Sequence, residues 1–326
     1  MGTETEMGSR SLSLLDLLLG EHFSYAKPTG SVKVERVLGK SVATHVHADY
    51  PLQFMIPKKA TPADVDSVLV YALNFGGGIV SGDAIFCELK VGEDTTVVLT
   101  TQGCTNVFKS VKGQTSHQTL KASVGSGALL AVLPDSLVCF ANARYSQVQA
   151  FDIATNGNLV LVDWLTSGRV ARGEIWNFDL FKSINHIYIE GDTPLLLDSV
   201  CLEQGMGLSI ADRMDDFQVL GLVVIYGPKL ALMRKAIQSN VQSLTARAMK
   251  NQKSFSSRGA SAAQGSWPKQ TLSTHELFAS CSPLGPSEEG LVVRVAARET
   301  KTVYQFLKEQ LSALQPLIGI PPYARR

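Results

Sequence analysis

The chain has 326 residues, of which 45% are apolar and 18% charged, so it can bury a sizeable core in one or two domains. Lys and Arg total 30 while Asp and Glu total 29, which leaves a net charge of +1. Without a basic excess there is no electrostatic footprint for nucleic acid or for an anionic membrane surface. The composition therefore predicts a globular protein that binds neither nucleic acid nor a membrane.

Residues 1–29 are expected to form an N-terminal extension ahead of a domain that spans 30–326. The apolar stretch SLSLLDLLLG at 11–20 is short and is interrupted by Asp16, which is unlike a secretory signal. No stretch approaches the roughly 18 apolar residues of a transmembrane helix. The five cysteines are scattered and form no CxxC pair, which argues against a zinc cage or a thioredoxin-like site. These features predict a reduced, cytoplasmic chain.

Between residues 30 and 215 the dominant period is two, as expected for strands with one buried face. In VKVERV, Val32 and Val34 share one face and charged residues share the other. The same alternation occurs in TLKASV at 119–124 and in EIWNFDL at 174–180. Glycine-rich and Asn-Gly turns separate the runs, and no helical period lies between them. This pattern predicts a large, mostly antiparallel β-domain.

Within this region, LNFGGGIVSGD at 73–83 combines three consecutive glycines with a following carboxylate. A phosphate-binding loop would need Gly-Lys-Ser/Thr, whereas here Asp83 would repel a phosphate. A dinucleotide fingerprint should open a helix, yet the apolar residues around Asp83 indicate further strand. The stretch is therefore interpreted as a tight turn or bulge between strands, where glycine supplies a positive φ. A ligand site remains the alternative.

Two later segments switch to helical spacing. Apolar residues recur every three or four positions over 228–249, with Pro228 near the start, and again over 301–314, where Pro316 is expected to end the helix. The segment at 249–270 between them is rich in Ser, Gly, Ala and Gln and is expected to be a mobile insertion. The sequence thus predicts two amphipathic helices attached to the β-domain.

Nucleophilic catalysis has little support in this sequence, since there is no GxSxG motif and no cysteine in a recognisable catalytic context. His45 and His47 would lie on one face of a strand and could bind a metal. No third ligand is set by local spacing, so two exposed histidines on a strand or loop are the favoured interpretation.

Four carboxylates lie in or beside apolar strand patterns: Asp83, Asp163, Glu174 and Asp198. An acid in such a place faces solvent, pairs with an arginine or lines a wet interior passage. Arg169 and Arg172 are candidate partners. Four acids without a nucleophile suggest transient binding of a cation, and oxygen ligands bind nickel-like ions weakly enough to release them.

Several blocks, in order, carry a resemblance to one known family. NFGGGIVSGDAI at 74–85 is similar to the Pro-Pro-Gly-Gly-hydrophobic-Val-Gly-Gly-Asp signature of the urease accessory protein D family. Further similar blocks are LTTQGCTNVFKS (99–110), AVLPDSLVCFANARY (131–145), LVDWLTSGRVARGE (161–174), TPLLLDSV (193–200) and GLVVRVAARETKTVYQFLKEQLSALQPLIG (290–319). The N-terminal extension and the insertion look like those of plant members.

This resemblance implies a mainly β fold, a large solenoid-like stack of strands with two helices. It also implies a non-enzymatic scaffold or chaperone that binds urease apoprotein and accessory proteins F and G, and that helps deliver nickel to the urease active site. The proposed nickel route is a water-filled internal passage. The residues that match its acidic and hydroxyl positions are Asp83, Thr105, Asp163, Asp198 and Glu174, which implies weak, transient nickel binding and no organic cofactor.

The chain also departs from the family pattern. Asn74-Phe75 replace the paired prolines and Cys104 stands where many members have alanine, which adds either a soft ligand or a small buried residue. Two other functions stay open: a hydrolase that uses Asp83 and Glu174 as an acid–base pair, or an interaction module whose acids only pair with arginines. The low aromatic content, 7%, disfavours a sugar hydrolase.

Overall fold

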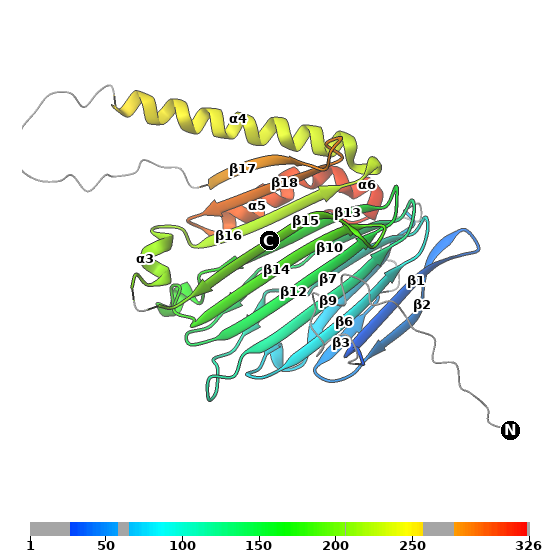
Figure 1. Cartoon of the computed structure of the whole chain (residues 1–326), viewed down its shortest axis with the longest axis horizontal. Helices are drawn as coiled ribbons and strands as arrows, with labels where there is room; N and C mark the ends of the chain where they lie inside the picture. The colour runs from blue at the N-terminus through cyan, green and yellow to red at the C-terminus, as the bar shows by residue number, and fades with distance from the viewer. Residues whose placement is uncertain (1–26, 58–64, 206, 257–276, 325–326) are drawn as a thin grey trace, which may run out of the picture.

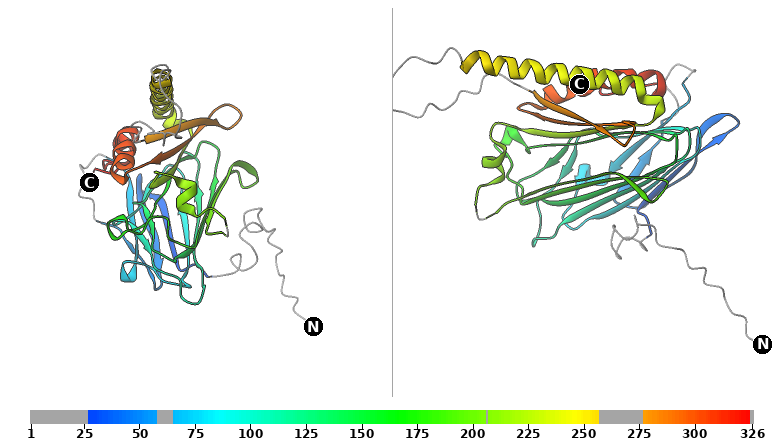
Figure 2. Two further views of the ribbon diagram at one scale, coloured as in Figure 1. Left: turned by 90° about the vertical axis from the view of Figure 1, so that its left-hand side faces the viewer. Right: turned by 45° about the horizontal axis from the view of Figure 1, so that its top comes forward.

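The computed structural model of the chain describes residues 27–57, 65–205, 207–256 and 277–324. Two large sheets face each other, and helices pack against the outside of one of them (Figures 1 and 2). We call them sheet A, with strand order β15-β14-β12-β9-β6-β1-β2, and sheet B, with order β17-β18-β16-β13-β10-β7-β4-β3. The predicted fold class, a mainly β stack with a few helices, is confirmed.

Sheet A comprises β1 (Gly30–Val37), β2 (Lys40–Ala48), β6 (Ala84–Val91), β9 (Ser116–Val124), β12 (Arg144–Ile153), β14 (Leu180–Ile189) and β15 (Thr193–Glu203). Sheet B comprises β3 (Leu52–Met55), β4 (Val68–Asn74), β7 (Thr96–Thr101), β10 (Leu129–Leu133), β13 (Asn158–Thr166), β16 (Val219–Tyr226), β17 (Leu277–Leu284) and β18 (Gly290–Ala297). Three short strands also belong to sheet B, where they pair with one another and with β13: β5 (Gly78–Ile79), β8 (Thr105–Val107) and β11 (Leu137–Cys139).

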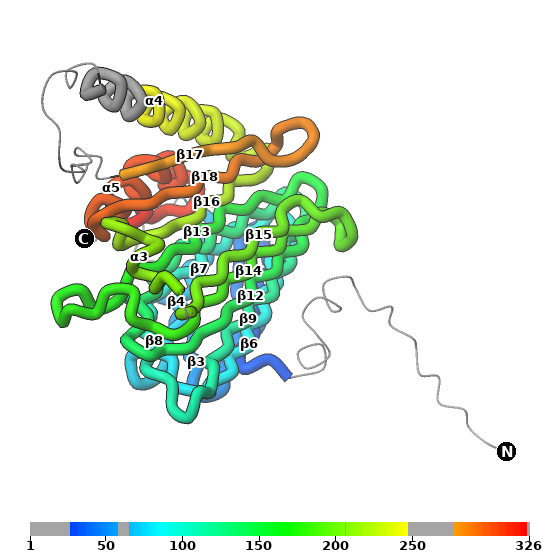
Figure 3. The backbone as a smooth tube through the Cα atoms, turned by 60° about the vertical axis from the view of Figure 1, so that its left-hand side comes forward, coloured from blue at the N-terminus to red at the C-terminus, as the bar shows by residue number. Residues whose placement is uncertain are grey.

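The strands in the middle of both sheets are parallel, so the prediction of a mostly antiparallel domain is wrong. In sheet A, β1, β6, β9, β12 and β14 pair in parallel, and in sheet B so do β4, β7, β10 and β13. The chain moves from one sheet to the other and back. Two parallel neighbours in one sheet are therefore connected through a strand of the opposite sheet, where other folds usually have a helix. The result is a stack of coils, which Figure 3 shows side by side.

Residues at equivalent places in successive coils stack to form the core between the sheets. Val70, Leu99, Val132 and Leu161 are register partners across four strands, and all are buried. Burial of each such side chain contributes about 1.5–3 kcal/mol. The predicted inward faces of VKVERV and TLKASV are also confirmed, because Val32, Val34, Leu120, Ala122 and Val124 are all buried.

Sheet B is buried on both faces, which explains its unbroken apolar runs. In β10, Leu130 and Val132 join the core between the sheets, while Leu129, Ala131 and Leu133 join a second core under the helices. A strand covered on both sides has no need of polar alternation. Such runs look alike in the sequence whether they are parallel or antiparallel.

The helical layer over sheet B consists of α4 (Ala231–Ser256), α5 (Thr300–Gln310) and α6 (Gln315–Ile318); the short α3 (Ile210–Met214) precedes β16 (Figure 1). The two predicted helices are confirmed, with shifted ends. Pro316 stands in the first turn of α6, where its missing N–H is harmless, so it does not end the preceding helix as predicted. The backbone of α4 extends into the predicted insertion at 249–270, most of which lies outside the described residues.

The alternating residues at 174–180 form a loop, so the strand predicted there is wrong. Trp176 and Phe178 are fully buried and in edge-to-face contact, with ring centroids 5.9 Å apart. Trp176 has a φ of 54° and its indole N–H donates to the carbonyl of Phe217 at 2.8 Å. Both rings fill the end of the core between β13 and β14, so burial rather than strand geometry explains the apolar spacing.

The glycine segment is a turn between strands, as interpreted from the sequence. Gly76 and Gly77 have φ of 75° and 76°, a region that favours glycine. A Cβ on Gly78 would lie 2.4 Å from the carbonyl oxygen of Asn106, because β5 and β8 pair closely there. The segment lies at the corner of the first coil and begins no helix of the phosphate-binding type.

Of the predicted N-terminal extension, 1–29, residues 1–26 lie outside the described residues. The first described strand, β1, starts at Gly30. In the described part of the chain, no helix is both long enough and apolar enough to cross a membrane.

Candidate functional site

Polar side chains interrupt the core between the sheets along one band of sheet A. Gln147 and Ser183 are register partners on β12 and β14, and Asn185 on β14 is the partner of Asp198 on β15. Gln147, Ser183 and Asn185 are each at most 7% exposed. Since buried polar groups need hydrogen-bond partners, this band requires an acceptor on the facing sheet.

Asp163 of β13 in sheet B is that acceptor. Its Oδ1 accepts from Nε2 of Gln147 at 2.8 Å. Its Oδ2 accepts from the Ser183 hydroxyl at 2.6 Å and from Nδ2 of Asn185 at 2.8 Å. All three donors are neutral, so the carboxylate is positioned without a cationic partner. Both of its oxygens are therefore held by neutral donors of the facing sheet.

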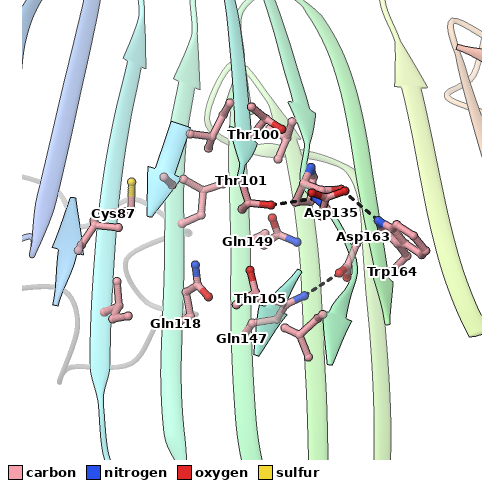
Figure 4. A pocket seen from close by; sticks show the side chains of 18 of the residues that line it. Cys87, Thr100, Thr101, Thr105, Gln118, Asp135, Gln147, Gln149, Asp163 and Trp164 are labelled. Atoms are coloured by element: carbon pink, nitrogen blue, oxygen red, sulfur yellow. Dashed lines mark hydrogen bonds between the residues drawn. The ribbon is translucent and has the colours of Figure 1, made fainter. Parts of the chain in front are cut away.

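Asp163 and Trp164 line two cavities. The first cavity has a volume of about 100 Å³ and is also lined by Thr105, the first residue of β8 (Figure 4). The second cavity has a volume of about 540 Å³ and is lined by Asp198. The structure thus brings three of the predicted site residues, Thr105, Asp163 and Asp198, onto adjoining cavities.

Asp198 lies at the far side of the second cavity and pairs with an arginine. Its Oδ1 accepts from the guanidinium of Arg294 on β18 at 2.7 Å. The Asp198 side chain is 10% exposed and that of Arg294 is 55% exposed. This ion pair joins sheet A to sheet B at the edge of the sandwich.

Asp83 has a different role in the structure. Its Oδ2 accepts from the backbone N–H of Val80 at 2.8 Å, and its own N–H donates to the Val80 carbonyl at 3.0 Å. Asp83 lines neither cavity. The Asp83 carboxylate stabilises the turn that precedes β6.

Glu174 is held in an ion pair, also outside both cavities. Its carboxylate accepts from Nε of Arg169 at 2.8 Å and from the backbone N–H of Ala141 at 3.2 Å. The Arg169 guanidinium lies over the ring of Phe140, 3.8 Å from its centroid. The hydrogen bond from Arg169 lowers the pKa of Glu174, against a smaller opposing effect of burial.

We expect Glu174→Gln to lower the free energy of unfolding at pH 7 by about 1 kcal/mol, as for other accessible ion pairs. Because the folded pKa lies below the unfolded one, the pair stabilises the protein above about pH 4.3 and the benefit disappears as pH falls through the folded pKa. Urea titrations of variant and parent at pH 7 and pH 3 test this. Glu203→Gln, whose pair with Arg144 spans 3.7 Å, is the control and should change little. An equal loss at both pH values would contradict a charge effect.

The remaining candidate ligands do not assemble into a metal centre. His45 contacts the Ser31 hydroxyl at 3.0 Å and His47 contacts Asp49 at 3.2 Å, both at accessible places on β2. Cys104 accepts a hydrogen bond from Ser136 at 3.2 Å. Among the described residues, no three His, Cys, Asp or Glu side chains are grouped to hold an ion.

The sequence interpretation missed part of this site. Asp135 lines the first cavity, where its backbone N–H donates to Thr101 at 2.9 Å and its carboxylate accepts from Tyr304 of α5 at 2.7 Å. Gln118, Gln147 and Gln149 face the same cavity (Figure 4). The sequence did contain a sign of this polar lining, since glutamines occupy inward positions of β9 and β12 where alternation predicts apolar residues.

Comparison with known proteins decides the family. The family described as UreD urease accessory protein matches residues 27–326. The chain belongs to the UreD family. Urease accessory protein D of Arabidopsis thaliana is 47% identical over 91% of this chain and 99% of its own length. The protein of the same name from Oryza sativa subsp. indica is 44% identical over 91% of this chain and 96% of its own.

A bacterial UreD aligns over the same share of the chain. Urease accessory protein UreD of Anaeromyxobacter sp. is 33% identical over 91% of this chain and 88% of its own length. The resemblance inferred from the sequence blocks is therefore confirmed, and two of these relatives are plant proteins. The UreD match begins at residue 27 and so includes both cavities and all five predicted site residues.

Proposed function

We propose that this protein is a non-enzymatic urease maturation factor of the cytoplasm, which binds urease apoprotein together with accessory proteins F and G and passes nickel through its interior. The observation that supports this is the Asp163 carboxylate, which borders both cavities and has only neutral hydrogen-bond donors. The UreD membership supports the maturation role.

The chemistry of the lining suits a cation that must be released. Thr105, Asp163 and Asp198 offer oxygen donors, and oxygen ligands hold nickel less firmly than imidazole or thiolate ligands would. An ionised carboxylate in a dry core costs several kcal/mol, so acids that border cavities favour water inside them. A nickel ion could exchange water for carboxylate oxygen at each of these residues.

We assign structural roles to Asp83 and Glu174 within this proposal. Their carboxylates are engaged by Val80 and Arg169 and border neither cavity. For the same reason the two residues are poorly placed to act as the acid–base pair of a hydrolase, which must flank a bound substrate.

The test is urease maturation in a reconstituted mixture of apourease, accessory proteins F and G, nickel and GTP, with and without this protein. We expect nickel per urease active site to depend on the protein, and affinity-tagged protein to retain apourease and protein F in a pull-down. Binding without any effect on nickel content would leave a purely structural interaction module. Full nickel loading in its absence would refute the proposal.

A further inference from the structure

The second cavity opens at the edge of the sandwich, where the two sheets end. Its walls come from β14 and β15 of sheet A and from β13, β16, β17 and β18 of sheet B, with Thr245 of α4 nearby. The charged side chains that line it within the described chain are Asp163, Asp198 and Arg294. The rest of the wall is mostly apolar, so these three residues determine its electrostatics.

Arg294 is unexpected in this position. It occupies an inward place on β18, two residues from Val292 of the core between the sheets, in a strand that is otherwise apolar. Its one described partner is Asp198. An arginine in a passage for cations repels them, so its presence there requires an explanation.

The different exposures of Asp198 and Arg294 suggest an explanation for this arginine. Asp198 is 10% exposed and, unlike Asp163, has a cationic partner, so losing that partner without a replacement would be destabilising. Arg294 is 55% exposed and can move its guanidinium into solvent at small cost. The pair is therefore asymmetric, with a nearly buried acid that favours a partner and an exposed cation that can leave.

We propose that Arg294 is a displaceable counter-ion at the mouth of the second cavity. It neutralises Asp198 when no metal is present and gives way when a divalent cation arrives. This inference rests on the proposed passage and adds a residue to it. The cation replaces the guanidinium as the partner of Asp198, so the acid is never left unpaired, and Asp163 is the next oxygen donor inward.

Competition for Asp198 has a measurable consequence for nickel affinity. Arg294→Gln keeps a hydrogen-bond donor beside Asp198 and removes the competing charge. We expect Ni²⁺ to bind the purified protein about fivefold more tightly, the upper range for one accessible ion pair. Arg294→Lys keeps the charge and should stay close to the parent. Equilibrium dialysis with nickel chloride alone measures both, and thermal unfolding verifies that each variant is folded.

Arg298→Gln is the matched control. Arg298 follows β18 and pairs with Asp216 at 2.8 Å, but it lines neither cavity. Its replacement removes one positive charge from the same region and should leave nickel affinity unchanged. A gain equal to that of Arg294→Gln would mean that net charge alone matters and would overturn the proposal.

A double-variant cycle with Asp198→Asn separates competition from repulsion. If Arg294 competes for Asp198, the gain from Arg294→Gln should fall by at least about half in the Asp198→Asn background, because coupled residues are not additive. An undiminished gain would overturn the proposal. The proposal would also be overturned if Arg294→Gln left the nickel affinity unchanged while Asp163→Asn weakened it. That result would still support the passage. If neither variant changes nickel binding, the passage itself fails.

Discussion

Asp163→Ala is expected to lower nickel per urease active site by about tenfold, the size of effect seen when a metal site loses one essential group. Asp163 borders both cavities, so on the proposed nickel route its loss would remove the oxygen donor between them. The measurement is nickel per active site after reconstituted maturation, with pull-down yield recorded beside it. Normal nickel content would contradict a role of Asp163 in transfer.

The same change also affects stability, which the experiment must separate from transfer. Without the carboxylate, Gln147, Ser183 and Asn185 lose an acceptor in a nearly closed interior, at a cost of about 1–3 kcal/mol for each group that stays unsatisfied. Water in the adjoining cavities can satisfy some of them. Asp83→Ala is the control, since it breaks a turn hydrogen bond yet should leave nickel transfer intact in folded protein.

Trp176→Ala is expected to lower the free energy of unfolding by about 3–5 kcal/mol, the range for loss of a fully buried aromatic side chain. The indole is 0% exposed, packs on Phe178 and donates to the Phe217 carbonyl, so the change both opens a cavity and removes a hydrogen bond. Urea unfolding followed by circular dichroism measures the loss. A loss below about 1 kcal/mol would contradict this account.

Leu232→Ala is the control for the tryptophan variant. Leu232 is 86% exposed on α4, so its truncation changes the buried apolar surface very little. Its unfolding midpoint should remain close to that of the parent, as is usual for surface substitutions. A similar loss in both variants would point to a general sensitivity of the stack rather than to the Trp176 contacts.

Local sequence was sufficient to predict those structural features that depend on residues close together in the chain. Alternation placed Val32 and Val34 on a buried face, and helical spacing located α4 and α5, because these periods depend on residues close in the chain. The glycine turn before Asp83 was also predictable, since positive φ is a local property. The ordered blocks added the family, which the comparisons confirm.

Tertiary structure alone decided the direction of the strands and the membership of the site. Asp83, Asp163, Glu174 and Asp198 have similar apolar neighbours in the sequence, yet only Asp163 and Asp198 border the cavities. Register within sheet A groups Gln147, Ser183 and Asn185. Packing of sheet A on sheet B then brings them to Asp163 and brings Asp198 to Arg294. These partners are far apart in the chain, so no local period records them. Local sequence thus determined most strands and helices, the loop at 174–180 excepted, while long-range contacts determined which acids share a cavity.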